Sequence, residues 1–200
     1  MNFRLAAGPT MAAMAVFLLC GQNVWAKTPE EVRAASITAV HLPRGGMPAL
    51  GDNPLFLGCA DYRSTIASNG ESSGFTFPEE MRRHADKGTA LVTDKDPGDA
   101  EIAEVVSQAA PHSCIVLGTY NGHILQGQLR LAKALAATGL PMILVALRNP
   151  YDLRNMPNHV AALAGWEYTR PLFDALWPVL NGTARPTGKL PLLTLTKAAK

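Results

Sequence analysis

Polar side chains of the kind that bind sugars follow several apolar runs of this chain. Amides, carboxylates, guanidinium groups and aromatic faces are suited to hold sugar hydroxyls and ring faces in a pocket. In parallel α/β sheets, ligands bind where the strands reach their carboxyl ends. The candidate substrate-binding residues are Asp61, Arg63, Tyr120, Asn121, His123, Arg148, Asn149 and Asp152. If the apolar runs are parallel strands, these residues lie together at one edge of the sheet and form one sugar-binding site.

The same polar residues also fit an ordinary structural role. Loops after strands are solvated and polar in any α/β protein. Asp94, Asp96, Glu167 and Tyr168 follow other predicted strands in the same way. Arg148 and Asp152 are equally suited to pair with each other or with loop carbonyls. Both interpretations stay open at this point.

The sequence lacks the common signatures of other chemistries. It has no GxGxxG after the first predicted strand, no P-loop, no HExxH and no GxSxG. His112 begins a predicted strand and is assigned a structural role. We therefore expect no metal and no cofactor. Charged residues make up 17% and the formal net charge is +2, with both signs interspersed, so we expect no nucleic-acid surface.

Apolar runs alternate with amphipathic segments along the chain. Strands are predicted at 55–57, 90–93, 113–117, 142–147 and 160–164, and the most apolar is 142–147. Helices are predicted at 28–40 and 78–85, from a cap at Asp99 to residue 109, over 125–136, and from Thr169 until Pro178 kinks or ends the helix. This alternation predicts an α/β fold with a mostly parallel, five- to six-stranded sheet sandwiched between helices in flavodoxin-like order. Residues 27–200 are expected to form a single domain.

The first 26 residues have the composition of a secretory signal. Arg4 precedes an apolar run over residues 11–20, and Ala26 suits the last position before cleavage. We expect a secreted or periplasmic protein, cut after about Ala26, with no membrane span afterwards. An uncleaved anchor and a lipoprotein modified at Cys20 are the alternatives.

Cleavage at that point leaves two cysteines, Cys59 and Cys114. Cys59 ends one predicted strand and Cys114 begins another, so in a parallel sheet they lie at opposite edges. We predict two buried free thiols rather than a disulfide.

Several segments resemble the C-terminal domain of family 3 glycoside hydrolases, above all its two-domain β-N-acetylglucosaminidase branch. The most specific is Ala-Leu-Arg-Asn-Pro-Tyr-Asp-Leu at 146–153, together with Gly-Thr-Tyr-Asn at 118–121. Weaker similarities follow in order at 35–38, 127–129, 167–169 and 186–191, so the resemblance extends from Thr28 to Leu195.

The resemblance implies a sheet between helices, which agrees with the pattern of the sequence. It also implies a missing part, because the family's nucleophilic Asp lies on an N-terminal (β/α)₈ barrel of about 250 residues. In larger β-glucosidases an acid/base Glu follows this domain's first strand, and Glu71 occupies a comparable loop. The flanking aromatic residues of that Glu are absent, so Glu71 is a weak catalytic candidate with a solvated loop acid as the alternative.

Three hypotheses about function remain open. The first is an accessory domain that binds β-linked amino-sugar glycans and works with a separately encoded catalytic barrel. The second is a stand-alone carbohydrate-binding module. The third is an independent hydrolase of O-glycosyl bonds with a rebuilt site around Asp61 and Glu71, whose retaining chemistry needs two carboxyls about 5–5.5 Å apart.

Overall fold

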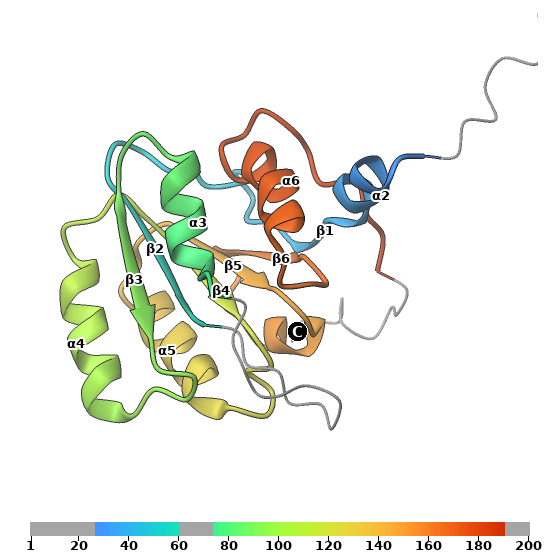
Figure 1. The fold of residues 1–200 in the computed structure, drawn as a ribbon. Helices are drawn as coiled ribbons and strands as arrows, with labels where there is room; N and C mark the ends of the chain where they lie inside the picture. Colours follow the sequence, from blue (N-terminus) through green and yellow to red (C-terminus); the bar gives the residue numbers. More distant parts are fainter. Residues whose placement is uncertain (1–26, 61–73, 191–200) are drawn as a thin grey trace, which may run out of the picture.

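The computed structural model describes residues 27–60 and 74–190, which build a six-stranded sheet covered by helices on both faces (Figure 1). The sheet order is β1-β6-β5-β4-β2-β3, and all neighbours are parallel except β1, which runs antiparallel to β6. The strands are β1 (Thr38–His41), β2 (Pro54–Cys59), β3 (Thr89–Thr93), β4 (Cys114–Thr119), β5 (Met142–Ala146) and β6 (Val160–Ala164). The five parallel strands have the flavodoxin-like order, so the predicted fold class is confirmed.

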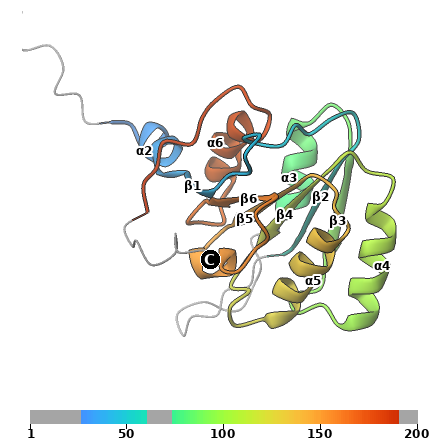
Figure 2. The same ribbon diagram turned by 180° about the vertical axis from the view of Figure 1, so that it is seen from behind.

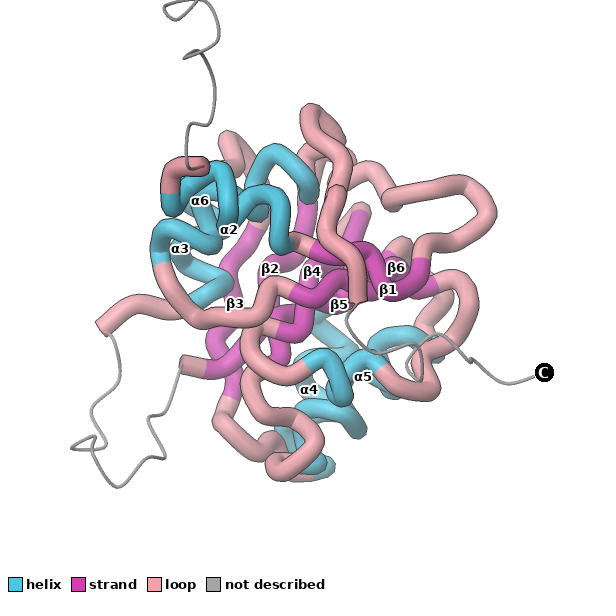
Figure 3. Tube along the Cα trace, turned by 90° about the vertical axis from the view of Figure 1, so that its right-hand side faces the viewer, coloured by secondary structure: helices cyan, strands magenta, loops and turns pink. Residues whose placement is uncertain are grey.

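The helices form two layers. They are α2 (Pro29–Ser36), α3 (Phe77–His84), α4 (Asp99–Ala109), α5 (Gln126–Ala137) and α6 (Arg170–Leu180), with a 3₁₀ turn, η1 (Pro150–Leu153). Helices α4 and α5 lie on one face of the sheet, and α3 and α6 lie on the other (Figures 2 and 3). Right-handed crossovers between parallel strands distribute the helices in this way.

Two apolar clusters fill the spaces between the sheet and its helices. Leu55 and Leu57 of β2 pack toward α4 and α5, while Phe56 between them packs toward α3 and α6. Every residue of β5 is buried. A strand that is covered on both faces needs apolar side chains at every position, and this explains why the central strands were predictable as continuous apolar runs.

The N-terminal segment differs from the prediction of one helix over residues 28–40. Thr28 caps α2 as expected and accepts a hydrogen bond from the Glu31 amide at 3.2 Å, but the helix ends at Ser36. Residues from Thr38 onward form β1, whose β-branched Thr38 and Val40 favour a strand. The described C-terminal segment returns to this corner, where the Gly188 amide donates to the Ile37 carbonyl at 2.9 Å (Figure 1).

The predicted cap at Asp99 is wrong, and so is the alternative that Pro178 ends the last helix. Asp99 does not cap α4; Gly98 holds the cap position without a side-chain bond, and Asp99 lies 3.5 Å from Arg130 Nε instead. Pro178 does not end α6, which continues to Leu180. The carbonyl that loses its partner belongs to Asp174, one turn earlier, and Asp174 is exposed, so water can replace the missing bond.

Cys59 and Cys114 are buried and are not joined in a disulfide, as predicted. The proposed signal segment and three candidate site residues, Asp61, Arg63 and Glu71, lie outside the described residues. Within residues 27–60 and 74–190, no helix combines the length and apolar character needed to cross a bilayer.

Candidate functional site

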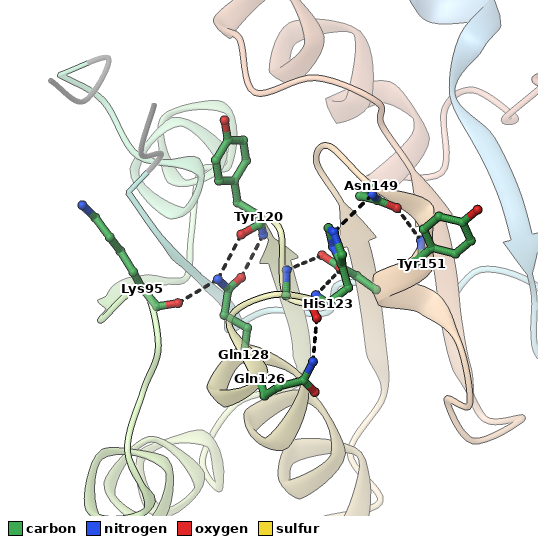
Figure 4. Close-up of polar contacts among 9 residues, drawn as sticks. Lys95, Tyr120, His123, Gln126, Gln128, Asn149 and Tyr151 are labelled. Carbon is green, nitrogen blue, oxygen red and sulfur yellow. Dashed lines mark hydrogen bonds and ion pairs between the residues drawn. The ribbon is translucent and has the colours of Figure 1, made fainter. Parts of the chain in front are cut away.

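The loops after β4 and β5 meet at the carboxyl edge of the sheet, and they bring most of the predicted site residues together (Figure 4). Tyr120, Asn121 and His123 come from the first loop, and Arg148, Asn149 and Asp152 come from the second. We call these six residues and Tyr151 the crest. Two neighbouring parallel strands end here in register, with Thr119 paired to Ala146, so their following loops lie side by side.

Asp152 organises the crest from below. Its side chain is 0% exposed, and its two oxygens accept hydrogen bonds from the backbone amides of Gly122 at 2.9 Å and His123 at 2.7 Å. The Nδ1 atom of His123 lies 3.2 Å from the same carboxylate. Asp152 therefore fixes both the loop and the imidazole, and its buried oxygens are not offered to a ligand.

A buried glutamine holds the beginning of the same loop. The side chain of Gln128 accepts from the Tyr120 amide at 2.8 Å and donates to the Tyr120 carbonyl at 3.0 Å and the Lys95 carbonyl at 2.8 Å (Figure 4). Asn121 then takes a left-handed conformation with φ of 57°, which Asn tolerates better than most residues. This turn lets the chain reverse over Asp152.

Edge-to-face contact between two tyrosine rings connects the crest to the segment after β6. Arg148 Nη1 donates to the Tyr120 hydroxyl at 2.9 Å, and Tyr168 meets the Tyr120 ring edge-on with 5.3 Å between centroids. The Tyr168 hydroxyl donates to the Cys59 carbonyl at 3.0 Å and accepts from the Phe77 amide at 2.8 Å. Arg148, an ion-pair candidate for Asp152 in the sequence, is therefore bound to Tyr120 instead.

The upper side of the crest presents hydrogen-bonding groups to solvent. The His123 side chain is 31% exposed, and its Nε2 lies 3.5 Å from Asn149 Nδ2. Tyr151 is 37% exposed and carries the Arg154 guanidinium over its ring at 4.2 Å. An imidazole, an amide, a phenol and a guanidinium can together donate to and accept from several hydroxyl groups.

Asp96 and Glu167, which also follow predicted strands, and Asn149 of the crest form bonds within the protein itself. Asp96 accepts a bond from the Gly127 amide at 2.6 Å, at the start of α5, and Asn149 Oδ1 caps η1 through the Tyr151 amide at 3.0 Å. Glu167 forms an ion pair with Arg33. The sequence analysis did not identify Gln128. Its position on the same helical face as the buried Leu131, Ala132 and Leu135 indicates an internal hydrogen-bonding role.

In the part of the chain that the structure describes, no three His, Cys, Asp or Glu side chains gather as metal ligands would. Burial raises the pKa of the Cys114 thiol in the core to about 12. A thiol with so high a pKa stays protonated and unreactive at neutral pH.

A hollow lies at the opposite, amino edge of the sheet. It has a volume of about 680 Å³ and is lined by the segment before β2, the turn after α3 and the end of α6. Its side chains include Asp52, His84, Lys87, Trp177 and Asn181. His84 stacks on Trp177 at 5.8 Å and lies 3.1 Å from Asp174 Oδ1.

No family model matches the sequence, and no curated protein is similar enough to match. Solved structures do match. A family 3 β-N-acetylglucosaminidase from Paenibacillus sp. str. FPU-7 superposes with a TM-score of 0.69 at 22% identity, covering 96% of this chain and 35% of the enzyme.

Two other glycosidases share the fold at lower identity. A β-glucosidase from Listeria innocua, in complex with isofagomine, gives a TM-score of 0.61 at 14% identity, with 78% of this chain and 25% of that chain covered. A family 3 exo-β-xylosidase gives 0.62 at 16% identity, with 80% and 24% covered. The chain thus spans about a third or less of these enzymes, and the resemblance found in its sequence is confirmed at the level of the fold: this chain has the α/β architecture of the C-terminal domain of family 3 glycoside hydrolases.

Proposed function

We propose that this chain is an accessory domain that binds β-linked amino-sugar glycans at the crest and works beside a catalytic (β/α)₈ barrel. One observation carries the proposal. The loops after β4 and β5 present His123, Asn149 and Tyr151 to solvent from a base fixed by buried Asp152. Such prior fixing lowers the cost of binding, because the polar groups need no further ordering.

The geometry supports binding rather than independent catalysis. Retaining hydrolysis needs a nucleophilic carboxylate and a second carboxyl about 5–5.5 Å away. Asp152 is the one carboxylate of the crest as defined above, and both of its oxygens already accept backbone hydrogen bonds. His123 can exchange a proton with a hydroxyl, but the crest provides no nucleophile beside it.

The size of the similar enzymes is the reason for including a barrel in the proposal. This chain corresponds to 35% of the Paenibacillus enzyme and 25% of the Listeria enzyme, so most of each of those glycosidases lies outside the shared fold. A barrel of about 250 residues fits in that remainder. We propose that a domain of this fold contributes hydrogen-bonding loops to a sugar held mainly by such a barrel.

Calorimetric titration of the purified chain with N-acetylglucosamine oligomers tests the binding function. We expect saturable heat that is lost in Tyr151→Ala and weakened about tenfold in His123→Ala, since a hydrogen bond to a ligand contributes about 1.4 kcal/mol. His159→Ala is the matched control, because His159 lies outside the crest and its ring bonds the Ala136 carbonyl. Absence of heat with every oligomer would rule out the proposed ligand.

An aryl-glycoside assay tests the division of labour. We expect no turnover by this chain alone, and an increased kcat/KM when it is added to a family 3 barrel that lacks its own α/β domain. The increase should disappear with the Tyr151→Ala variant. Turnover by the isolated chain would instead favour an independent hydrolase.

A further inference from the structure

The residue after Gly165, at the end of β6, has an unusual backbone. Trp166 has a φ of 74°, in the left-handed region that bulky side chains rarely occupy. Such conformations persist only where the surrounding structure imposes them, and they concentrate at binding sites. The feature lies at the carboxyl edge of the sheet, where ligands of these folds bind.

Two contacts with α2, one from Trp166 and one from the next residue, hold this segment in place. The indole Nε1 of Trp166 donates to the Ser36 carbonyl, at the end of α2, at 2.9 Å. The next residue, Glu167, pairs with Arg33 one turn earlier in α2. The loop after β6 is therefore tied to α2 at two points, and the half-buried indole has a fixed position.

Hollows lie against this indole. One of about 600 Å³ is lined by α2 and residues 165–167, and another of about 380 Å³ is lined by the end of α2 and residues 188–189. Ser36 and Trp166 line both of them. Both hollows are shallow and open to solvent, so a ligand here would lie against the indole rather than be enclosed.

The charges around Trp166 are mainly positive. Lys27 and Arg33 line the first hollow with Glu167, and Lys189 lines the second. Arg33 and Glu167 neutralise each other. Neither lysine has an ion-pair partner within residues 27–60 and 74–190, so two ammonium groups remain for an anionic ligand.

We infer that these hollows form a second subsite, which binds a sugar ring that carries a carboxylate. The ring packs on the indole of Trp166, and Lys27 or Lys189 pairs with the carboxylate. The carboxylate of Glu167, which is paired with Arg33, can still accept a hydrogen bond from a sugar hydroxyl. The inference rests on the proposed function for the class of ligand, whereas the site is separate from the crest.

Tryptophan fluorescence tests the inference on the full chain. The probes are methyl β-D-glucuronide and methyl β-D-glucoside. They differ only at C6, which is a carboxylate in the first and a hydroxymethyl group in the second. We expect the glucuronide to change the emission and to bind about fivefold more tightly than the glucoside, as one exposed charge pair contributes up to about 1 kcal/mol. The Lys27→Gln/Lys189→Gln double variant should bind both equally.

Variants at the two described tryptophans locate the signal. Trp166→Asn and Trp166→Gly remove the ring but suit the left-handed backbone, so both should fold and lose glucuronide binding. Trp177→Phe replaces the tryptophan of the amino-edge hollow and should leave glucuronide binding unchanged. Should both Trp166 variants fail to fold, judged by circular dichroism, the lysine double variant decides alone.

Three results would overturn the inference: equal binding of the two glycosides by the unaltered chain, glucuronide binding that survives in folded Trp166→Asn, or full competition by inorganic phosphate. Tyr151→Ala separates this site from the crest, because it should abolish binding of N-acetylglucosamine oligomers and leave glucuronide binding intact. Oligomer binding without glucuronide binding removes only the second subsite.

Discussion

The charged side chains at the two edges of the sheet differ in their exposure to solvent. At the amino edge, a hollow of about 680 Å³ is bordered by Asp52, whose side chain is 100% exposed, and by Lys87, which is 70% exposed and 3.7 Å from it. At the carboxyl edge, Asp152 is 0% exposed and accepts two backbone bonds and the His123 contact. The charges of the amino-edge hollow are exposed to solvent, while the carboxylate of the crest is buried and hydrogen-bonded.

This contrast shows why the presence of a hollow alone is a poor guide to function in this chain. An exposed side chain loses conformational freedom whenever it binds, and that loss opposes binding. A side chain anchored by buried partners has already lost that freedom during folding. The carboxyl edge is therefore better prepared for a ligand, although Trp177 and His84 give the amino edge an aromatic surface.

The largest expected effect comes from removing the buried anchor. Asp152→Ala leaves the amides of Gly122 and His123 without acceptors, and it should lower the free energy of unfolding by about 3 kcal/mol. Urea denaturation measures this change. Asp52→Ala is the matched control at the amino edge and should leave the midpoint unchanged. Equal midpoints for the two variants would remove the distinction between the edges.

A smaller loss is expected from the amide that holds the Tyr120 loop. Gln128→Ala removes three hydrogen bonds to buried or half-buried backbone groups, so unfolding should need about 2 kcal/mol less. Gln108 lies exposed on α4 and bonds only Glu104 Oε1, at 3.1 Å, which makes Gln108→Ala its control. A loss of similar size in both variants would show that the loop does not depend on Gln128.

The core thiol predicts a pH dependence that is independent of the crest. Burial raises the pKa of Cys114 from 9.0 to about 12, so between these values the unfolded chain releases a proton that the folded chain keeps. Stability should therefore fall as the pH rises above about 9, by at most about 1.4 kcal/mol per pH unit. Chemical denaturation at pH 8 and pH 10 measures the loss, and Cys114→Ala should make the dependence shallower by that amount.

The smallest effect is expected at the amino edge. Lys87→Met breaks the ion pair with Asp52, but both side chains are solvated, so neither the urea midpoint nor its salt dependence should change measurably. A clear loss of stability would show that this hollow is more ordered than its exposure suggests.

Sequence patterns predicted the central sheet because its strands are apolar at every position, as in residues 142–146. They missed β1, a four-residue edge strand that follows directly after a helix, since so short a segment has little periodicity of its own. The failed cap at Asp99 and the continuation of α6 past Pro178 have a similar cause. Local preferences there are weaker than the packing of the whole element.

The crest was predictable as a set of residues but not as a network. The position of polar residues after parallel strands is enough to bring His123 and Asn149 together. That Asp152 is the carboxylate buried beneath the loops, and that Arg148 binds Tyr120, depends on contacts between loops about thirty residues apart. The left-handed Trp166 had no signal at all, because an aromatic residue gives no local reason for a positive φ.

The hydrogen bond from Gly188 to Ile37 brings the last described residues beside the segment that joins α2 to β1, so both ends of the described chain lie on the α2 side of the molecule (Figure 1). A unit with neighbouring ends can be inserted into a surface loop of a host protein without forcing the host apart. For the same reason, a short linker between the two ends, with new ends opened in the exposed turn after α3, should yield a circular permutant that keeps the same sheet order.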